Sequence, residues 1–128
     1  MAKGEAEFLK QRAEKFLANG EDLLNKGIFD LAAFNFEQYC QLILKYYLFL
    51  EVGDFPKTHF LKDLLTELGK VYKKENSAKK LLDRDVQVIS NLENAYITSR
   101  YVPSIFIEGE VREMLGFCKK LTEFLKNL

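Results

Sequence analysis

The longest apolar stretch of the chain covers residues 28–51, and few polar side chains interrupt it. A helix turns by about 100° per residue, so each position can be placed around its axis. The polar residues Asp30, Glu37, Gln38, Gln41 and Lys45 fall in one stripe about 100° wide. The rest of the circumference is almost entirely apolar, which is typical of a helix packed on most sides. We therefore predict a central helix with one polar stripe left for water, a partner or a ligand.

Four further segments repeat apolar residues at helical spacing, over residues 3–26, 58–72, 77–99 and 110–127. Gly27 suits the left-handed turn that often ends a helix, and such a short connection favours antiparallel neighbours. No alternating strand pattern or hairpin turn is present. The sequence predicts an all-α, antiparallel up-and-down bundle of about five helices, forming a single domain over residues 1–128.

Composition narrows the classes of function. The 128 residues contain 19 Lys and Arg and 19 Asp and Glu, so no overall field attracts nucleic acid and any such contact must be local. Gln41 and Lys45 lie in mid-segment and argue against a membrane span. Without a secretory signal, Cys40 and Cys118 are expected to be reduced, buried thiols of a cytoplasmic protein. Two cysteines and the single histidine, His59, do not make a metal site, and no cofactor is predicted.

Two motifs resemble those of the HEPN family (higher eukaryotes and prokaryotes nucleotide-binding domain). The family's second helix usually shows Gln-Gln-Ala-Ala-Glu, followed four residues after the Glu by Lys. Here Gln38 matches the second Gln, Lys45 matches the Lys, and Gln41 stands where the Glu usually stands. Near the end of the penultimate long helix, residues 98–103 (Thr-Ser-Arg-Tyr-Val-Pro) resemble the family's Ala-Arg-Tyr-Pro, with one residue inserted before the proline.

The resemblance implies a helical bundle, commonly a homodimer, with one of two uses. Some family members are metal-independent ribonucleases whose signature is an Arg with a His four to six residues downstream. Others accompany a minimal nucleotidyltransferase, fused to it or as a separate subunit. No His follows Arg100 at that spacing, and His59 belongs to a different helix. We therefore expect a non-catalytic chain, with no catalytic residue of its own.

The favoured hypothesis is a binding module that holds a nucleotide or an RNA phosphate, or that partners a minimal nucleotidyltransferase in a toxin–antitoxin type of system. Arg100 would contact phosphate through its planar fork, and Tyr101 would stack on a base. Lys45, Gln41 and Gln38 would add polar contacts. The competing interpretations are a salt bridge for Arg100, a core position for Tyr101 and a solvent-facing tail for Lys45.

Two other functions stay open at this point. One is a degenerate HEPN ribonuclease in which Arg100 acts with Tyr101 or Glu37 in place of the histidine. The other is a purely structural dimerisation subunit. A homodimer is expected whichever function holds, because the segment 105–107 and two faces of the last helix carry more apolar side chains than one small core needs. His59 is interpreted as a helix-start residue bonded to a loop.

Overall fold

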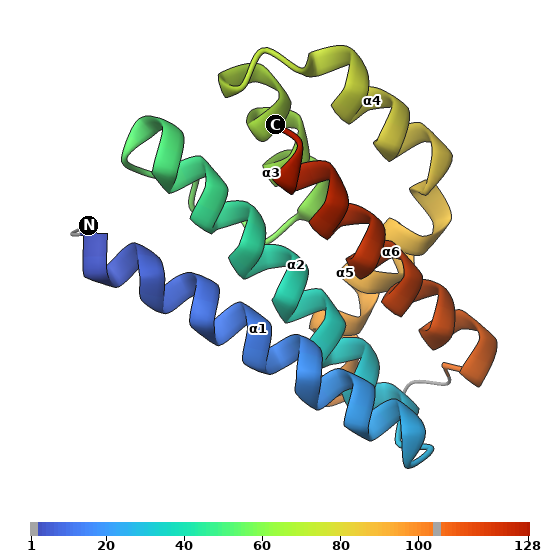
Figure 1. Cartoon of the computed structure of the whole chain (residues 1–128). Coiled ribbons are helices and arrows are strands. Elements are labelled where there is room, and N and C mark those ends of the chain that lie inside the picture. Colours follow the sequence, from blue (N-terminus) through green and yellow to red (C-terminus); the bar gives the residue numbers. More distant parts are fainter. Residues whose placement is uncertain (1–2, 104–105) are drawn as a thin grey trace.

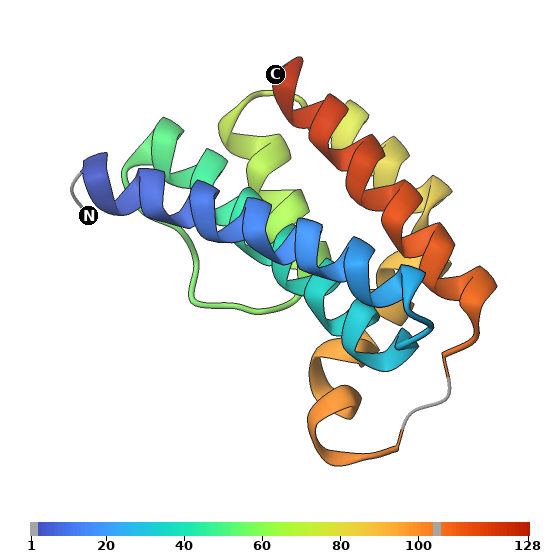
Figure 2. The same cartoon turned by 60° about the horizontal axis from the view of Figure 1, so that its bottom comes forward.

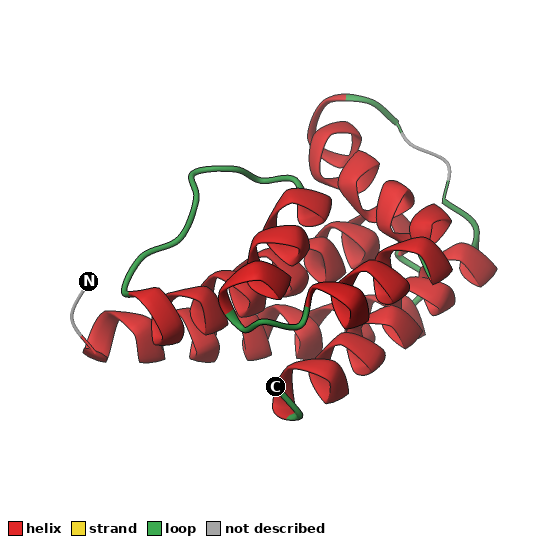
Figure 3. Cartoon of the chain, turned by 90° about the horizontal axis from the view of Figure 1, so that it is seen from above, coloured by secondary structure: helices red, strands yellow, loops and turns green. Residues whose placement is uncertain are grey.

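The computed structural model describes residues 3–103 and 106–128, and every regular element within these residues is a helix. The helices are α1 (Lys3–Asn25), α2 (Phe29–Val52), α3 (Leu61–Val71), α4 (Glu75–Arg84), α5 (Val86–Tyr101) and α6 (Glu108–Lys126). Figure 1 shows α1 and α2 side by side and antiparallel, and Figure 3 shows helices and loops but no strand in the part of the chain that the structure describes. The predicted all-α bundle is confirmed.

Helix α2 is the centre of the bundle, as the apolar stretch predicted. It packs against α1, α3, α5 and α6, so neighbours surround most of its circumference. Phe36, Leu44 and Leu48 are among its fully buried side chains, and burying such groups is the main favourable term in folding. Gly27 has a φ of 76° and makes the left-handed turn between α1 and α2, as predicted. Gly53 makes the same kind of turn at the end of α2.

The structure has one helix more than predicted, because the segment expected to form a single helix over residues 77–99 is divided at Asp85. The apolar side chains before the break, such as Leu81, are buried in α4, which packs mainly against α3. Those after it, such as Leu92, are buried in α5, which packs mainly against α2. A single straight helix could not pack against both α3 and α2 in this way. Lys120 of α6 binds the residue at this break, with its Nζ 2.9 and 3.0 Å from the two Asp85 carboxylate oxygens.

Helix α5 ends at the edge of the bundle, and its last turn projects beyond the other helices in Figure 2. Shortly before α6, the Phe106 backbone N–H donates to Asp30 Oδ1 of α2 over 3.4 Å. Ile97, Val102 and Ile107 are exposed around this connection. The predicted interface residue Ile105 lies outside the described residues.

The last helix does not have the two free apolar faces that the sequence suggested. Phe117 of α6 is buried within the chain, and Phe124 is half-buried against the same core. The apolar side chains of α6 therefore pack largely within this one chain. Within residues 3–103 and 106–128, no helix combines the length and the apolarity that crossing a membrane would require.

Candidate functional site

The polar stripe of α2 turns inward at Glu37, which is fully buried. Gln38 Nε2 donates to Glu37 Oε1 over 2.8 Å, and Gln41 Nε2 donates to Glu37 Oε2 over 2.5 Å. Burial raises the pKa of Glu37 to about 7, an effect that the two amide hydrogen bonds and Lys45 partly oppose. The expectation that the whole stripe faces water or a ligand is therefore wrong at Glu37 and Gln41. The physical reason is that neighbouring helices surround α2, and the amides of Gln38 and Gln41 satisfy the Glu37 carboxyl.

Lys45 lies one turn further along the same stripe and is half-buried. Its ammonium nitrogen is 5.4 Å from the centroid of the Phe55 ring, in the loop after α2. Burial lowers the pKa of Lys45, while the charge of Glu37 acts in the opposite direction. Lys45 is therefore more than a solvent-facing tail: it combines a cation–π contact with an electrostatic link to the buried carboxyl.

Glu93 of α5 connects this region to the start of α3. Its Oε2 accepts a hydrogen bond from the Lys62 backbone N–H over 3.1 Å, and its Oε1 is 3.6 Å from Lys62 Nζ. A carboxylate at the first turn of a helix satisfies an otherwise unpaired N–H and complements the helix dipole. This contact joins the first turn of α3 to α5, and His59 lies in the loop just before that turn.

Tyr96 is in contact with both His59 and Arg100. The His59 and Tyr96 rings stack with centroids 4.7 Å apart and planes 25° apart. The Arg100 guanidinium carbon is 4.7 Å from the same Tyr96 centroid, and Arg100 Nε donates to the Tyr96 carbonyl oxygen over 3.3 Å. The sequence predicted that His59 begins a helix, but α3 begins at Leu61 and His59 lies in the loop before it. Its contact with an aromatic ring that also contacts Arg100 was not predicted.

Arg100 also lies near Tyr101, with its guanidinium carbon 5.2 Å from that ring. No carboxylate is within ion-pair distance of Arg100 in the part of the chain that the structure describes. The salt-bridge interpretation of Arg100 is therefore wrong for these residues. Tyr101 is 75% exposed, which also excludes a core position for it. The two residues present an accessible guanidinium and an accessible aromatic ring side by side.

The structure thus divides the predicted site residues into two groups. Gln38, Gln41 and Lys45 surround the buried Glu37, whereas Arg100 and Tyr101 lie at the exposed end of α5. Helix α5 links the groups, because Glu93 contributes to the electrostatics of Glu37 and lies on the same side of the helix as Tyr96 and Arg100. Sequence reasoning missed Glu93 and Tyr96. The signal available was their spacing, since positions 93, 96 and 100 recur at helical intervals.

The two cysteines do not contribute to this site. Cys40 and Cys118 are fully buried free thiols whose sulfur atoms are 3.8 Å apart. Burial raises the pKa of Cys40 well above its usual range, and a protonated thiol is a poor nucleophile. The predicted burial of both cysteines is confirmed, and their reduced state stays a prediction. No cluster of three or more His, Cys, Asp or Glu side chains suited to a metal ion occurs among residues 3–103 and 106–128.

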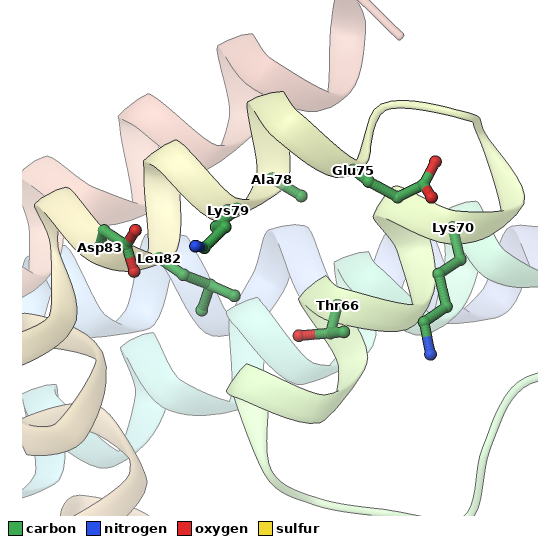
Figure 4. A pocket seen from close by; sticks show the side chains of 7 residues that line it. All are labelled: Thr66, Lys70, Glu75, Ala78, Lys79, Leu82 and Asp83. Carbon is green, nitrogen blue, oxygen red and sulfur yellow. The ribbon is translucent and has the colours of Figure 1, made fainter.

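A cavity of about 430 Å³ lies away from these residues, between α3 and α4. Figure 4 shows the carboxylates of Glu75 and Asp83 toward its two ends and the side chains of Leu82 and Thr66 between them. Its charged groups have mixed sign, since lysines also line it. This arrangement does not select one class of ligand, so we place the candidate site at α5 instead.

The model of the HEPN domain family matches residues 6–128, nearly the whole chain. The chain belongs to the HEPN domain family. No curated protein and no solved structure matches it. The match covers α2 with its polar stripe and α5 with Arg100, so both groups of site residues lie within the HEPN domain.

Proposed function

We propose that this HEPN domain is a non-catalytic subunit that binds a nucleotide or an RNA phosphate at Arg100 and Tyr101. The observation that carries the proposal is the exposed Arg100 guanidinium, which contacts two aromatic rings and pairs with no carboxylate of the described chain. A planar guanidinium that forms no ion pair within the protein can bind a phosphate through two parallel N–H donors. The ring of Tyr101 can stack on a base, which is how single-stranded RNA is commonly held.

The predicted site residues of α2, Gln38, Gln41 and Lys45, have a supporting role in this proposal. Lys45 adds a positive charge and Gln38 a half-buried amide. Both glutamine amides donate to the Glu37 carboxyl, and Gln41 is the more deeply buried of the two. We assign Lys45 and Gln38 to the margin of the binding surface. Gln41 has an indirect role, holding Glu37 and thereby the surface on which α5 packs.

A binding titration tests the proposal. A fluorescently labelled single-stranded RNA and AMP are each titrated into the protein at low and moderate salt. Substituting Arg100 by alanine should weaken binding of both, because both carry phosphate. The matched control is Arg112→Ala, since Arg112 is an exposed arginine of α6 already paired with Glu108. Equal affinities for wild type and Arg100→Ala would overturn the proposal.

We also propose a homodimer and, as a partner, a minimal nucleotidyltransferase of a cytoplasmic toxin–antitoxin type of system. The exposed apolar residues Ile97, Val102 and Ile107 around the α5–α6 connection support an interface there. Light scattering at tens of micromolar tests the homodimer, and a monomer would contradict it. Co-purification from the native cell tests the partner, and the absence of any nucleotidyltransferase from the captured material would contradict that part.

A second candidate function is metal-independent RNA cleavage, and the contact of His59 and Arg100 with one Tyr96 ring favours it. His59 would accept the proton of a 2′-hydroxyl whose oxygen bonds to phosphorus. The bond to the 5′-oxygen would break, and that oxygen would take the proton back from His59. Glu37 cannot be the base, because it is fully buried. If the wild-type protein cleaves RNA in the presence of EDTA and His59→Ala does not, this candidate is supported over simple binding.

A further inference from the structure

A second cavity lies between α1, α2 and α6, and nothing described so far uses it. Its volume is about 260 Å³. Its lining consists of Lys10, Glu14, Tyr39, Ile43, Tyr47, Thr122, Leu125 and Lys126. Positions 39, 43 and 47 of α2 share one helical face, roughly opposite the stripe of Glu37, Gln41 and Lys45. The cavity is therefore separate from the candidate site at α5.

The wall of this cavity carries a fixed hydroxyl pair. Thr122 Oγ1 donates its single hydrogen to the Cys118 carbonyl oxygen over 2.8 Å. In the hydrogen bond between Tyr39 and Thr122, the tyrosine hydroxyl must therefore be the donor. Tyr39 is almost fully buried, and burial raises its pKa to about 12, so the hydroxyl stays neutral. Its oxygen keeps lone pairs that can accept a hydrogen bond from a molecule inside the cavity.

Two lysines from different helices meet at the cavity. Lys10 comes from α1 and is half-buried, and Lys126 comes from the last turn of α6. Neither ammonium group pairs with a carboxylate within residues 3–103 and 106–128. Lys10 Nζ instead lies 5.9 Å from the centroid of the Tyr46 ring. Glu14 is the single acidic residue among the lining residues, so the cavity is positive overall.

We propose that this cavity binds a small amphipathic anion, a molecule with one ring and one carboxylate or phosphate group. Ile43, Leu125 and the tyrosine rings supply the apolar surface that would bury the ring. The ammonium groups of Lys10 and Lys126 supply donors for the anionic group. The volume is below the usual range for drug-sized ligands, about 300–1,000 Å³, which limits the ligand to a single ring.

The test uses four probes of one shape and different charge: phenyl phosphate, benzoate, benzyl alcohol and benzylamine. Each is titrated into the full chain and followed by NMR and by the melting temperature. The two anions should shift the signals of Thr122 and Leu125 and raise the melting temperature. Benzyl alcohol should bind more weakly than the anions, and benzylamine should not bind, because two ammonium groups repel it.

Substitutions then locate the bound anion. Lys10→Met and Lys126→Met keep the aliphatic stem and remove the charge, and each should weaken benzoate binding about three- to tenfold. Lys70→Met is the matched control, a lysine beside the α3–α4 cavity, and should change nothing. Arg100→Met should also leave benzoate binding unchanged, because the proposed nucleotide site is elsewhere.

Each outcome decides the proposal. It is overturned if benzylamine binds as well as benzoate, if neither anion binds at millimolar concentration, or if the two lysine substitutions have no effect. It is also overturned if Arg100→Met alone removes binding of both anions. That last result would place the anions at α5 and support phosphate binding at Arg100. The experiment therefore distinguishes a failure of the cavity proposal from a failure of the proposed function.

Discussion

Gly20 of α1 lies directly against the ring of Phe36 of α2. A Cβ atom at Gly20 would be 2.6 Å from Phe36 Cε1, closer than such atoms approach in proteins. Phe36 is fully buried and cannot move aside into solvent. The missing side chain therefore allows the two longest helices to pack closely at this point. A glycine within a helix is unfavourable by itself, so its presence here is explained by this contact.

We predict that Gly20→Ala destabilises the protein by about 1–3 kcal/mol, the usual cost of overpacking a core. The clash with Phe36 should outweigh the gain of about 1 kcal/mol that alanine offers over glycine in a helix. Chemical denaturation measures the free energy of unfolding. The control is Gly116→Ala in α6, where nothing lies within 4 Å of the added Cβ and a modest gain is expected. A similar gain at both positions would contradict the packing argument.

We predict that Glu37 makes stability fall as the pH rises. Burial raises the pKa of Glu37 from 4.5 to about 7, so between these values the folded state binds more protons than the unfolded state. Its contribution is fully present below pH 4.5 and is lost as the pH rises to about 7. The shift corresponds to about 3 kcal/mol.

The measurement compares the free energy of unfolding of wild type and Glu37→Gln between pH 4 and 8. Glutamine keeps the shape and has no proton to lose, so the difference between the two proteins isolates the carboxyl group. The variant should gain stability relative to wild type as the pH rises. A constant difference across this range would show that Glu37 keeps an ordinary pKa in the folded protein.

The central helix could be predicted from the sequence, because a helix buried on most sides needs apolar residues around most of its circumference. Such a long apolar stretch is visible in the sequence alone. The sequence also predicted the turn at Gly27. It could not predict the break at Asp85, because no proline or glycine marks it and the cause is the different partners of α4 and α5. The inward position of Glu37 was missed for a related reason, since polar residues predict solvent unless tertiary partners such as Gln38 and Gln41 satisfy them.

The candidate site was predictable only in part. Arg100 and Tyr101 were found from a local motif, because they are neighbours in the sequence. The stacking of His59 on Tyr96 joins residues far apart in the chain and depends on where the loop before α3 meets α5. Glu93 also joins α5 to the start of α3, through Lys62. No local pattern contains this information.

We predict that Ile43→Ala lowers the free energy of unfolding by about 2–5 kcal/mol, the range for emptying a buried aliphatic site. Ile43 is buried on the face of α2 toward α1 and α6. Its neighbour Leu42 is half-buried, so Leu42→Ala should cost less and serves as the matched comparison. Both variants are measured by urea denaturation. Equal, small losses below about 1 kcal/mol would contradict the central position of α2.

Arg100 contacts two tyrosine rings and one carbonyl oxygen. Exposed cation–π contacts contribute about 0.5–1 kcal/mol, so Arg100→Ala should change the melting temperature little. It should weaken phosphate binding by about 1.5–3 kcal/mol, the range for hydrogen bonds to charged groups. Arg100→Lys should restore only part of that loss, because lysine keeps the charge but lacks the planar fork.

Scanning calorimetry and one RNA titration, run on the same three proteins, separate a binding role for Arg100 from a structural one. A large fall in melting temperature with normal RNA binding would mean that Arg100 holds the end of α5 against Tyr96. Full rescue by lysine would mean that charge alone is recognised. Partial rescue at unchanged stability is the result expected of a guanidinium that binds phosphate, since lysine keeps the charge but lacks the planar set of paired donors.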